Sequence, residues 1–113
     1  MSEIAKKLDN HELYLILAEE AAELAQAAAK MSRKLSGKNP TPKSTSECQD
    51  DVIEELSDVQ NICDELNIHP NPDIIRMKHD RWVKRLELED VMQKDKETYD
   101  KFYKILFPQS FAK

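Results

Sequence analysis

The sequence of 113 residues has a single glycine, few aromatic residues and no long apolar run. The scarcity of glycine and aromatic residues, beside abundant alanine, leucine, glutamate and lysine, favours helices over strands. No apolar run approaches the roughly 20 residues that a membrane-spanning helix needs. The first residues, MSEIAKKLDN, contain no apolar signal core. We therefore expect a protein that is neither secreted nor embedded in a membrane.

Cysteine is also scarce, and basic residues are outnumbered by acidic ones. Cys48 and Cys63 form no disulfide-framework pattern and are too few for a cysteine zinc site without other ligands. A reduced, cytoplasmic location is the simplest interpretation. The formal net charge of -5 argues against a nucleic-acid-binding surface, which carries an excess of lysine and arginine. The length predicts one domain, residues 1–113, and so small a domain gains stability from oligomerisation.

Helix-capping signals mark the start and end of the first predicted helix. It runs from about Asp9, where Glu12 completes a capping box, to Leu35, just before Gly37. Two prolines and the only glycine then predict a loop over residues 36–46.

Three further helices are predicted after this loop. Ser46 and Gln49 provide a capping pair for the first of them, residues 47–66. Asn71 as N-cap and Pro72 at the first helical position begin the next, residues 72–90. The last is an amphipathic helix over residues 95–106.

Four acidic residues lie on or beside the faces that should be buried. Glu20 lies at the edge of an apolar stripe on the first helix, and Glu23 lies one step further round. Glu55 lies inside the apolar face of the second helix, with Asp58 at its rim. The predicted core positions are Leu13, Leu17, Ala21, Leu24, Ala28, Met31 and Leu35 on the first helix, and Val52, Leu56, Val59, Ile62, Cys63 and Leu66 on the second.

The spacing of these acids suits a metal site. Glu20 and Glu23 are three residues apart, as are Glu55 and Asp58, so each pair shares a helix face and the two pairs can oppose each other. A buried carboxylate is costly unless it is paired or binds a metal. Ligands that are all oxygen suit Mg²⁺, with Mn²⁺ as an alternative. The competing interpretation is an ordinary solvated acidic surface, which is common on glutamate-rich helices.

The first helix is apolar on its far side as well, where the residues are mostly alanine. A helix that is apolar on two faces is expected to pack on two sides, and small side chains permit close approach by a second subunit. The far-side residues are Leu15, Ala18, Ala22, Ala25 and Ala29. We therefore expect an all-α helical bundle that is completed by dimerisation.

Basic residues gather on the predicted helix 72–90. Lys78, Arg81 and Arg85 share one face at positions i, i+3 and i+7. The opposite stripe, with Trp82 and Leu86, is expected to be core. The basic face itself is either a binding surface or an ordinary solvated face.

The segments EEAAEL (residues 19–24) and EELSDV (residues 54–59) resemble the paired E-x-x-E and E-x-x-D motifs of the MazG-like all-α nucleoside triphosphate pyrophosphohydrolases. The likeness covers about residues 9–86. It implies hydrolysis of a nucleoside or deoxynucleoside triphosphate to the monophosphate and pyrophosphate, in a homodimer or a dimer of dimers. The four acidic positions, which would hold magnesium and carry catalysis, are Glu20, Glu23, Glu55 and Asp58.

The resemblance also suggests residues that contact the substrate. Family members carry basic residues in the third helix, so Lys78, Arg81 and Arg85 would neutralise triphosphate oxygens. Asn61 lies one turn beyond Asp58 and either touches the ligand or has a structural role.

Two alternatives stay open. Phosphoribosyl-ATP pyrophosphohydrolases share the acidic pairs, but they carry a Lys-x-Gly lead-in and a Tyr-His after the second motif. This chain has Ile16-Leu17-Ala18 and Gln60-Asn61 in those regions, which disfavours that activity. The other alternative is a non-enzymatic helical interaction module, in which the acids are surface charge and no magnesium is required.

Overall fold

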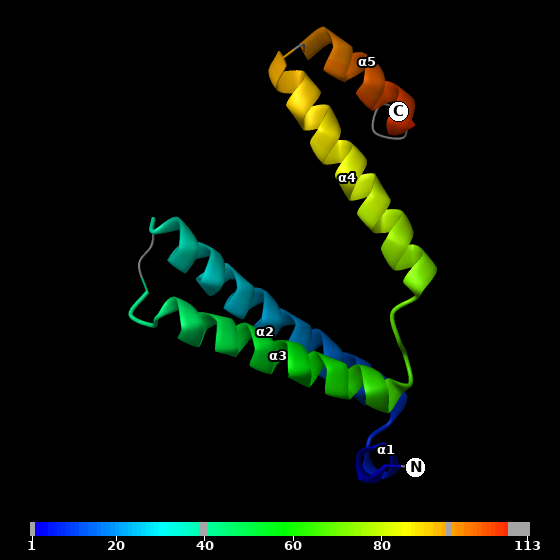
Figure 1. The fold of residues 1–113 in the computed structure, drawn as a ribbon. Coiled ribbons are helices and arrows are strands. Elements are labelled where there is room, and N and C mark those ends of the chain that lie inside the picture. The colour runs from blue at the N-terminus through cyan, green and yellow to red at the C-terminus, as the bar shows by residue number, and fades with distance from the viewer. Residues whose placement is uncertain (1, 39–40, 95, 109–113) are drawn as a thin grey trace. The chain divides into compact units, whose positions relative to one another are not determined.

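The computed structural model describes residues 2–38, 41–94 and 96–108, with the backbone alone described at residues 91, 92, 94 and 96–99. The elements are α1 (Glu3–Lys7), α2 (Asn10–Ser36), α3 (Thr45–Leu66), α4 (Pro72–Lys94) and α5 (Lys96–Leu106) (Figure 1). No described residue belongs to a strand, so the predicted all-α class is confirmed. Within the described ranges, none of the helices has the length and apolar character needed to cross a bilayer.

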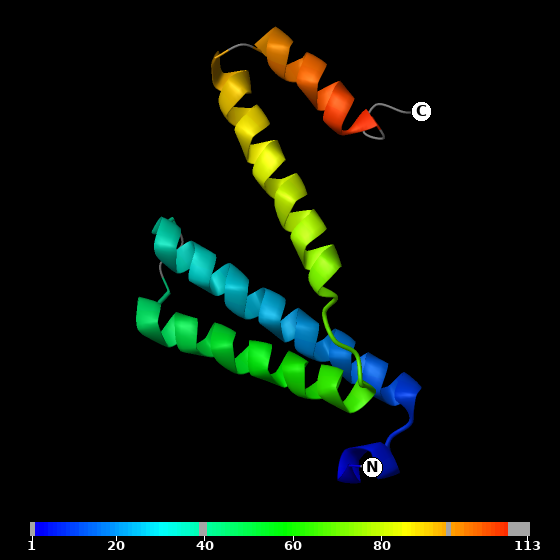
Figure 2. The same ribbon diagram turned by 45° about the vertical axis from the view of Figure 1, so that its right-hand side comes forward.

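The chain divides into two compact units, the first ending at His69 and the second beginning at Pro70. In the first unit, α2 and α3 lie side by side and run in opposite directions (Figures 1 and 2). In the second unit, α4 and α5 form another helical hairpin. The first unit contains every predicted metal ligand, and the second contains the predicted basic face.

The ends of α2 form as their sequence predicts. The Asp9 backbone N–H donates to the Glu12 carboxylate at 3.4 Å, within a capping box. Gly37 adopts a left-handed φ of 72°, and its N–H donates to the Arg33 carbonyl at 3.0 Å. A side chain is disfavoured in this conformation, so glycine is suited to ending the helix here.

The start of α3 differs from the prediction. Ser44, rather than Ser46, is the N-cap, and its hydroxyl accepts from the Glu47 N–H at 3.1 Å. The Glu47 carboxylate accepts from the Ser44 N–H at 3.1 Å. Hydrogen bonding of the Glu47 carboxylate to the Ser44 N–H first, and then to the Ser44 side chain, holds the pKa of Glu47 below its ordinary value. Both serines are followed three residues later by Glu or Gln, so the sequence alone offers two overlapping capping boxes.

The face of α2 that packs on α3 is turned by less than one residue step from the predicted stripe. Leu13 and Ala27 are buried, and Leu17, Glu20 and Leu24 are half-buried between them. The predicted core positions Ala21, Ala28 and Leu35 are exposed instead. Glu20 therefore faces α3 rather than lying at the edge of its helix face.

The matching face of α3 begins at the buried Cys48 and continues through half-buried Val52, Glu55 and Val59. Leu56, predicted to be core, is 53% exposed. The Glu55 carboxylate therefore lies in the helix contact, while the side chain of Leu56 beside it is exposed to solvent. Hydrophobic burial alone would favour the opposite arrangement.

A short helix and a cap complete the described structure. Helix α1, which the sequence did not predict, starts at Ser2, whose hydroxyl donates to the Glu65 carboxylate near the end of α3. In the second unit, Asn71 caps α4 as predicted by accepting from the Asp73 and Ile74 N–H groups at 2.9 and 3.2 Å.

Both units leave large apolar side chains in solvent. The predicted core stripe of α4 is exposed, and its Trp82 is 62% exposed. Leu15 and Leu35 on α2 are similarly exposed to solvent. Among the described residues, the buried apolar side chains are those of Leu13, Ala27, Cys48 and Leu88.

Candidate metal site

The α2–α3 contact brings together the four predicted carboxylates. Glu20 and Glu23 lie one turn apart on α2, and Glu55 and Asp58 lie one turn apart on α3. One carboxylate oxygen from each residue lies within 4.8 Å of the others. Two antiparallel helices bring the four carboxylates together when Glu20 lies opposite Asp58 and Glu23 lies opposite Glu55.

The environment of this cluster opposes negative charge. Glu20, Glu55 and Asp58 are half-buried, and Glu23 is exposed. Burial raises the pKa of Glu20, and repulsion from Glu23 and Asp58 raises it further. Burial also raises the pKa of Glu55, with further contributions from Glu23 and Asp58. Four acids in one place therefore cost free energy when all are ionised and no cation is near.

Two oxygen atoms of the cluster lack hydrogen-bond partners. Within the described part of the chain, Oε2 of Glu20 and Oε2 of Glu55 are buried and accept no hydrogen bond. A buried carboxylate oxygen usually has a donor, because leaving it unpaired costs about 1–3 kcal/mol or more. A cation would satisfy both atoms.

The residues fit a hard divalent cation. Magnesium takes oxygen ligands at about 2.1 Å, so opposite ligands lie about 4.2 Å apart. The 4.8 Å limit on the cluster is about half an ångström wider than this. Four carboxylates gathered at this separation offer enough oxygen atoms for one ion or for two.

A second acidic group, which the sequence analysis did not single out, lies at the start of α2. It consists of Asp9, His11 and Glu12. Two of its carboxylates belong to the capping box already described, and Asp9 and His11 are exposed. The requirements of a helix N-terminus therefore account for this group.

A polar hollow of about 330 Å³ adjoins the carboxylate cluster. Glu23 and Glu55 of the cluster line it, together with Gln26, Ala27, Lys30, Lys43 and Asp51. Lys43 donates to Asp51 at 2.7 Å, and this hydrogen bond raises the pKa of Lys43. Sequence reasoning missed both lysines. Lys30 could have been found, because it follows Glu23 by two helical turns on the same face.

The predicted substrate-binding residues do not all belong to one unit. Asn61 is exposed on α3, three residues beyond Asp58. Lys78, Arg81 and Arg85 lie on α4 and line a hollow of about 260 Å³ with Trp82. The expectation of a shared basic face is therefore met within the second unit.

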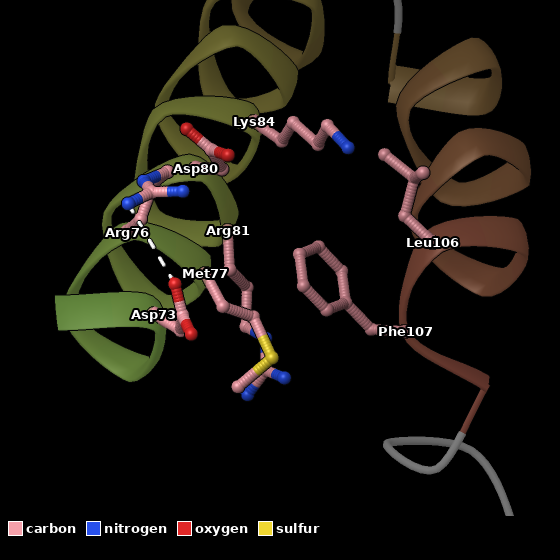
Figure 3. Close-up of a pocket in the computed structure, with 8 residues that line it drawn as sticks. All are labelled: Asp73, Arg76, Met77, Asp80, Arg81, Lys84, Leu106 and Phe107. Carbon is pink, nitrogen blue, oxygen red and sulfur yellow. Dashed lines mark ion pairs between the residues drawn. The ribbon is translucent and has the colours of Figure 1, made fainter. Parts of the chain in front are cut away.

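Arg81 also lines a larger hollow of about 460 Å³ between α4 and the end of α5 (Figure 3). The Phe107 ring points toward α4 there, and the Arg85 guanidinium lies 5.7 Å from its centroid. Arg76 is paired with Asp73 at 3.6 Å, which leaves Arg81 and Lys84 as the other cations of the lining. This hollow combines positive charge with an apolar wall formed by Met77, Leu106 and Phe107.

Comparison with protein-family models, with curated proteins and with solved structures gives no significant match. The MazG-like resemblance therefore stays a prediction that depends on the two acidic motifs. The geometry of the carboxylate cluster is independent of that resemblance.

Proposed function

We propose that this protein is a magnesium-dependent nucleoside triphosphate pyrophosphohydrolase, with Glu20, Glu23, Glu55 and Asp58 as its metal ligands. The observation that carries the proposal is the convergence of these carboxylates in a half-buried helix contact. Two of their oxygens are buried without a hydrogen-bond donor. Structural packing alone gives no reason for this arrangement, whereas a divalent cation does.

The resemblance to the MazG-like family suggests the reaction class, and the ligand chemistry is compatible with it. An oxygen-bound magnesium or manganese ion supplies charge neutralisation at phosphate oxygens and lowers the pKa of bound water. A carboxylate of the cluster that is free of metal would accept the proton of the attacking water. Attack at the α-phosphorus would release pyrophosphate and a nucleoside monophosphate, as the two acidic motifs predict.

The proposal includes a homodimer or a dimer of dimers. The alanine-rich face of α2, which includes exposed Leu15, supports it, because an apolar helix face gains free energy when a second copy covers it. Analytical ultracentrifugation of the full chain should give at least twice the monomer mass. A monomer at all concentrations would exclude this part of the proposal.

The direct test is a panel of canonical and modified nucleoside triphosphates incubated with metal-free protein, then with magnesium or manganese. We expect release of pyrophosphate and monophosphate in equal amounts, and only with a divalent ion present. Orthophosphate as the sole product would contradict the proposed cleavage point.

Exposed apolar side chains on both units support a second candidate function, a helical interaction module. That function requires neither metal nor hydrolysis. Thermal melting separates the two candidates. Magnesium at roughly 100 times its Kd should raise the unfolding temperature by about 10–15 °C if it binds the cluster, and should leave it unchanged otherwise.

A further inference from the structure

The hollow beside the carboxylate cluster is lined by charges of both signs. Its lining joins two cluster carboxylates, Glu23 and Glu55, and the Asp51 carboxylate to two ammonium groups, those of Lys30 and Lys43. Such a mixture suits a ligand that binds the metal at one end and carries further negative charge at the other. A metal-bound polyphosphate has this distribution of charge.

The two lysines differ in how far they are already neutralised. Lys43 is held by Asp51 at 2.7 Å, and that ion pair fixes its position on the wall of the hollow. Lys30 has no ion-pair partner among the residues that the structure describes, and it is exposed. Its charge is therefore available to a ligand without breaking an existing interaction.

The helix geometry directs Lys30 toward the cluster. Glu23, Gln26 and Lys30 follow one another at intervals of three and four residues, so they lie along one face of α2. Side chains on a helix lean toward its N-terminus, which for Lys30 is the direction of Gln26 and Glu23. Ala27 keeps the space between them open, because its side chain is a single methyl group.

The lining also excludes some occupants. Among the residues that the structure describes, Ala27 is the one apolar residue of the lining, and no aromatic side chain belongs to it. A nucleobase would find no ring on which to stack and little apolar area to cover. Phosphate oxygens would find two ammonium groups and the Gln26 amide.

We infer that the hollow receives the pyrophosphate end of the substrate, with Lys30 as its principal ligand and Lys43, held by Asp51, as the second. This inference deepens the proposed function and rests on it, because it needs the carboxylate cluster to hold the metal. It assigns leaving-group binding to α2 and to the loop before α3.

The test is calorimetric titration of the full chain with inorganic pyrophosphate in the presence of magnesium. The variant Lys30→Gln keeps a polar side chain of similar length and removes the charge. We expect it to bind pyrophosphate about tenfold more weakly or worse. Lys30→Arg should restore most of the affinity, and Lys38→Gln, an exposed lysine outside the hollow, should bind as the unaltered chain does.

The same proteins are then assayed for hydrolysis, which separates failure of the inference from failure of the function. Magnesium-dependent hydrolysis with pyrophosphate binding that is indifferent to Lys30 would overturn the inference and leave the proposed function standing. Absence of pyrophosphate binding by the unaltered chain would also overturn it. Binding that depends on Lys30, without hydrolysis of any triphosphate, would support the anion site and reject the proposed function.

Discussion

The two units of the chain carry opposite charge, and they place it differently. Up to His69 the sequence has fourteen acidic and seven basic residues, and from Pro70 onward it has eight acidic and ten basic ones. In the first unit, three of the clustered carboxylates are half-buried between helices. In the second, Lys78, Arg81 and Arg85 are all exposed. The placement of the charge, more than its amount, separates a candidate site from an ordinary surface, because only buried charge requires a compensating partner.

The largest expected effect comes from Glu55, the carboxylate at the centre of the buried face of α3. Glu55→Gln should lower magnesium-dependent hydrolysis by about a thousandfold, because it removes a ligand and leaves three acids. The matched control is Glu54→Gln on the exposed side of the same turn, which should keep near-normal activity. Equal losses of hydrolysis in the two variants would show that the activity does not depend on which of the two carboxylates is buried.

Core truncations test whether the two units are stabilised separately. Leu13 and Leu88 are buried in the first and second unit, at 1% and 6% exposure. Leu13→Ala should destabilise the α2–α3 unit by about 3 kcal/mol, and Leu88→Ala should act on α4–α5. Hydrogen exchange reports which helices lose protection in each variant. Loss of protection throughout the chain in both would show that the units unfold as one.

A smaller effect is expected from the basic face of the second unit. Arg81 lines two hollows of that unit, so Arg81→Ala removes the cation that they share. If α4 contacts the triphosphate, KM should rise about tenfold with little change in kcat. Lys101→Ala, an exposed lysine on α5, serves as the control. An unchanged KM would identify the basic face as solvated surface and leave phosphate binding to the first unit.

The smallest expected effect is on the pH dependence of stability in metal-free protein. Glu20 and Glu55 have folded-state pKa values above their ordinary values, chiefly because of burial. The folded state therefore binds protons more readily than the unfolded state, and stability should rise as pH falls from neutral toward 4.5, the ordinary pKa of a glutamate. Magnesium should stabilise the protein most at the upper end of this range, because protons compete with it. Thermal melting with a chelator or with magnesium measures both trends, and a flat metal-free profile would contradict the burial of these acids.

Local signals were enough to predict most helix ends. Asp9 with Glu12, Gly37, and Asn71 with Pro72 each act over three or four residues, and each lies where the sequence indicates. Short-range patterns of this kind do not depend on what packs against the helix. Helix α1 was missed because five residues are too few to show a period.

The orientation of α2 could not be predicted, because the helix is apolar on more than one side. Its sequence permits Ala21 and Ala28 or Glu20 and Ala27 to lie beside Leu17 and Leu24 in the contact, and these choices differ by a rotation of less than one residue step. The structure selects the second, which moves Glu20 into the contact. The acidic pairs were predicted from their spacing and from their place on or beside the apolar faces, whereas the position of Lys43 depends on how the loop returns to α3.

Because Cys48 is buried, its reactivity can report when the α2–α3 hairpin opens. Its thiol is 2% exposed, so an alkylating reagent can reach it only when this end of α2 and α3 separates. The labelling rate of Cys48 therefore reports how often the helix pair opens. Cys63, which is more accessible and lies further along α3, serves as an internal reference. An ion that bridges α2 and α3 should slow the alkylation of Cys48 without binding its sulfur.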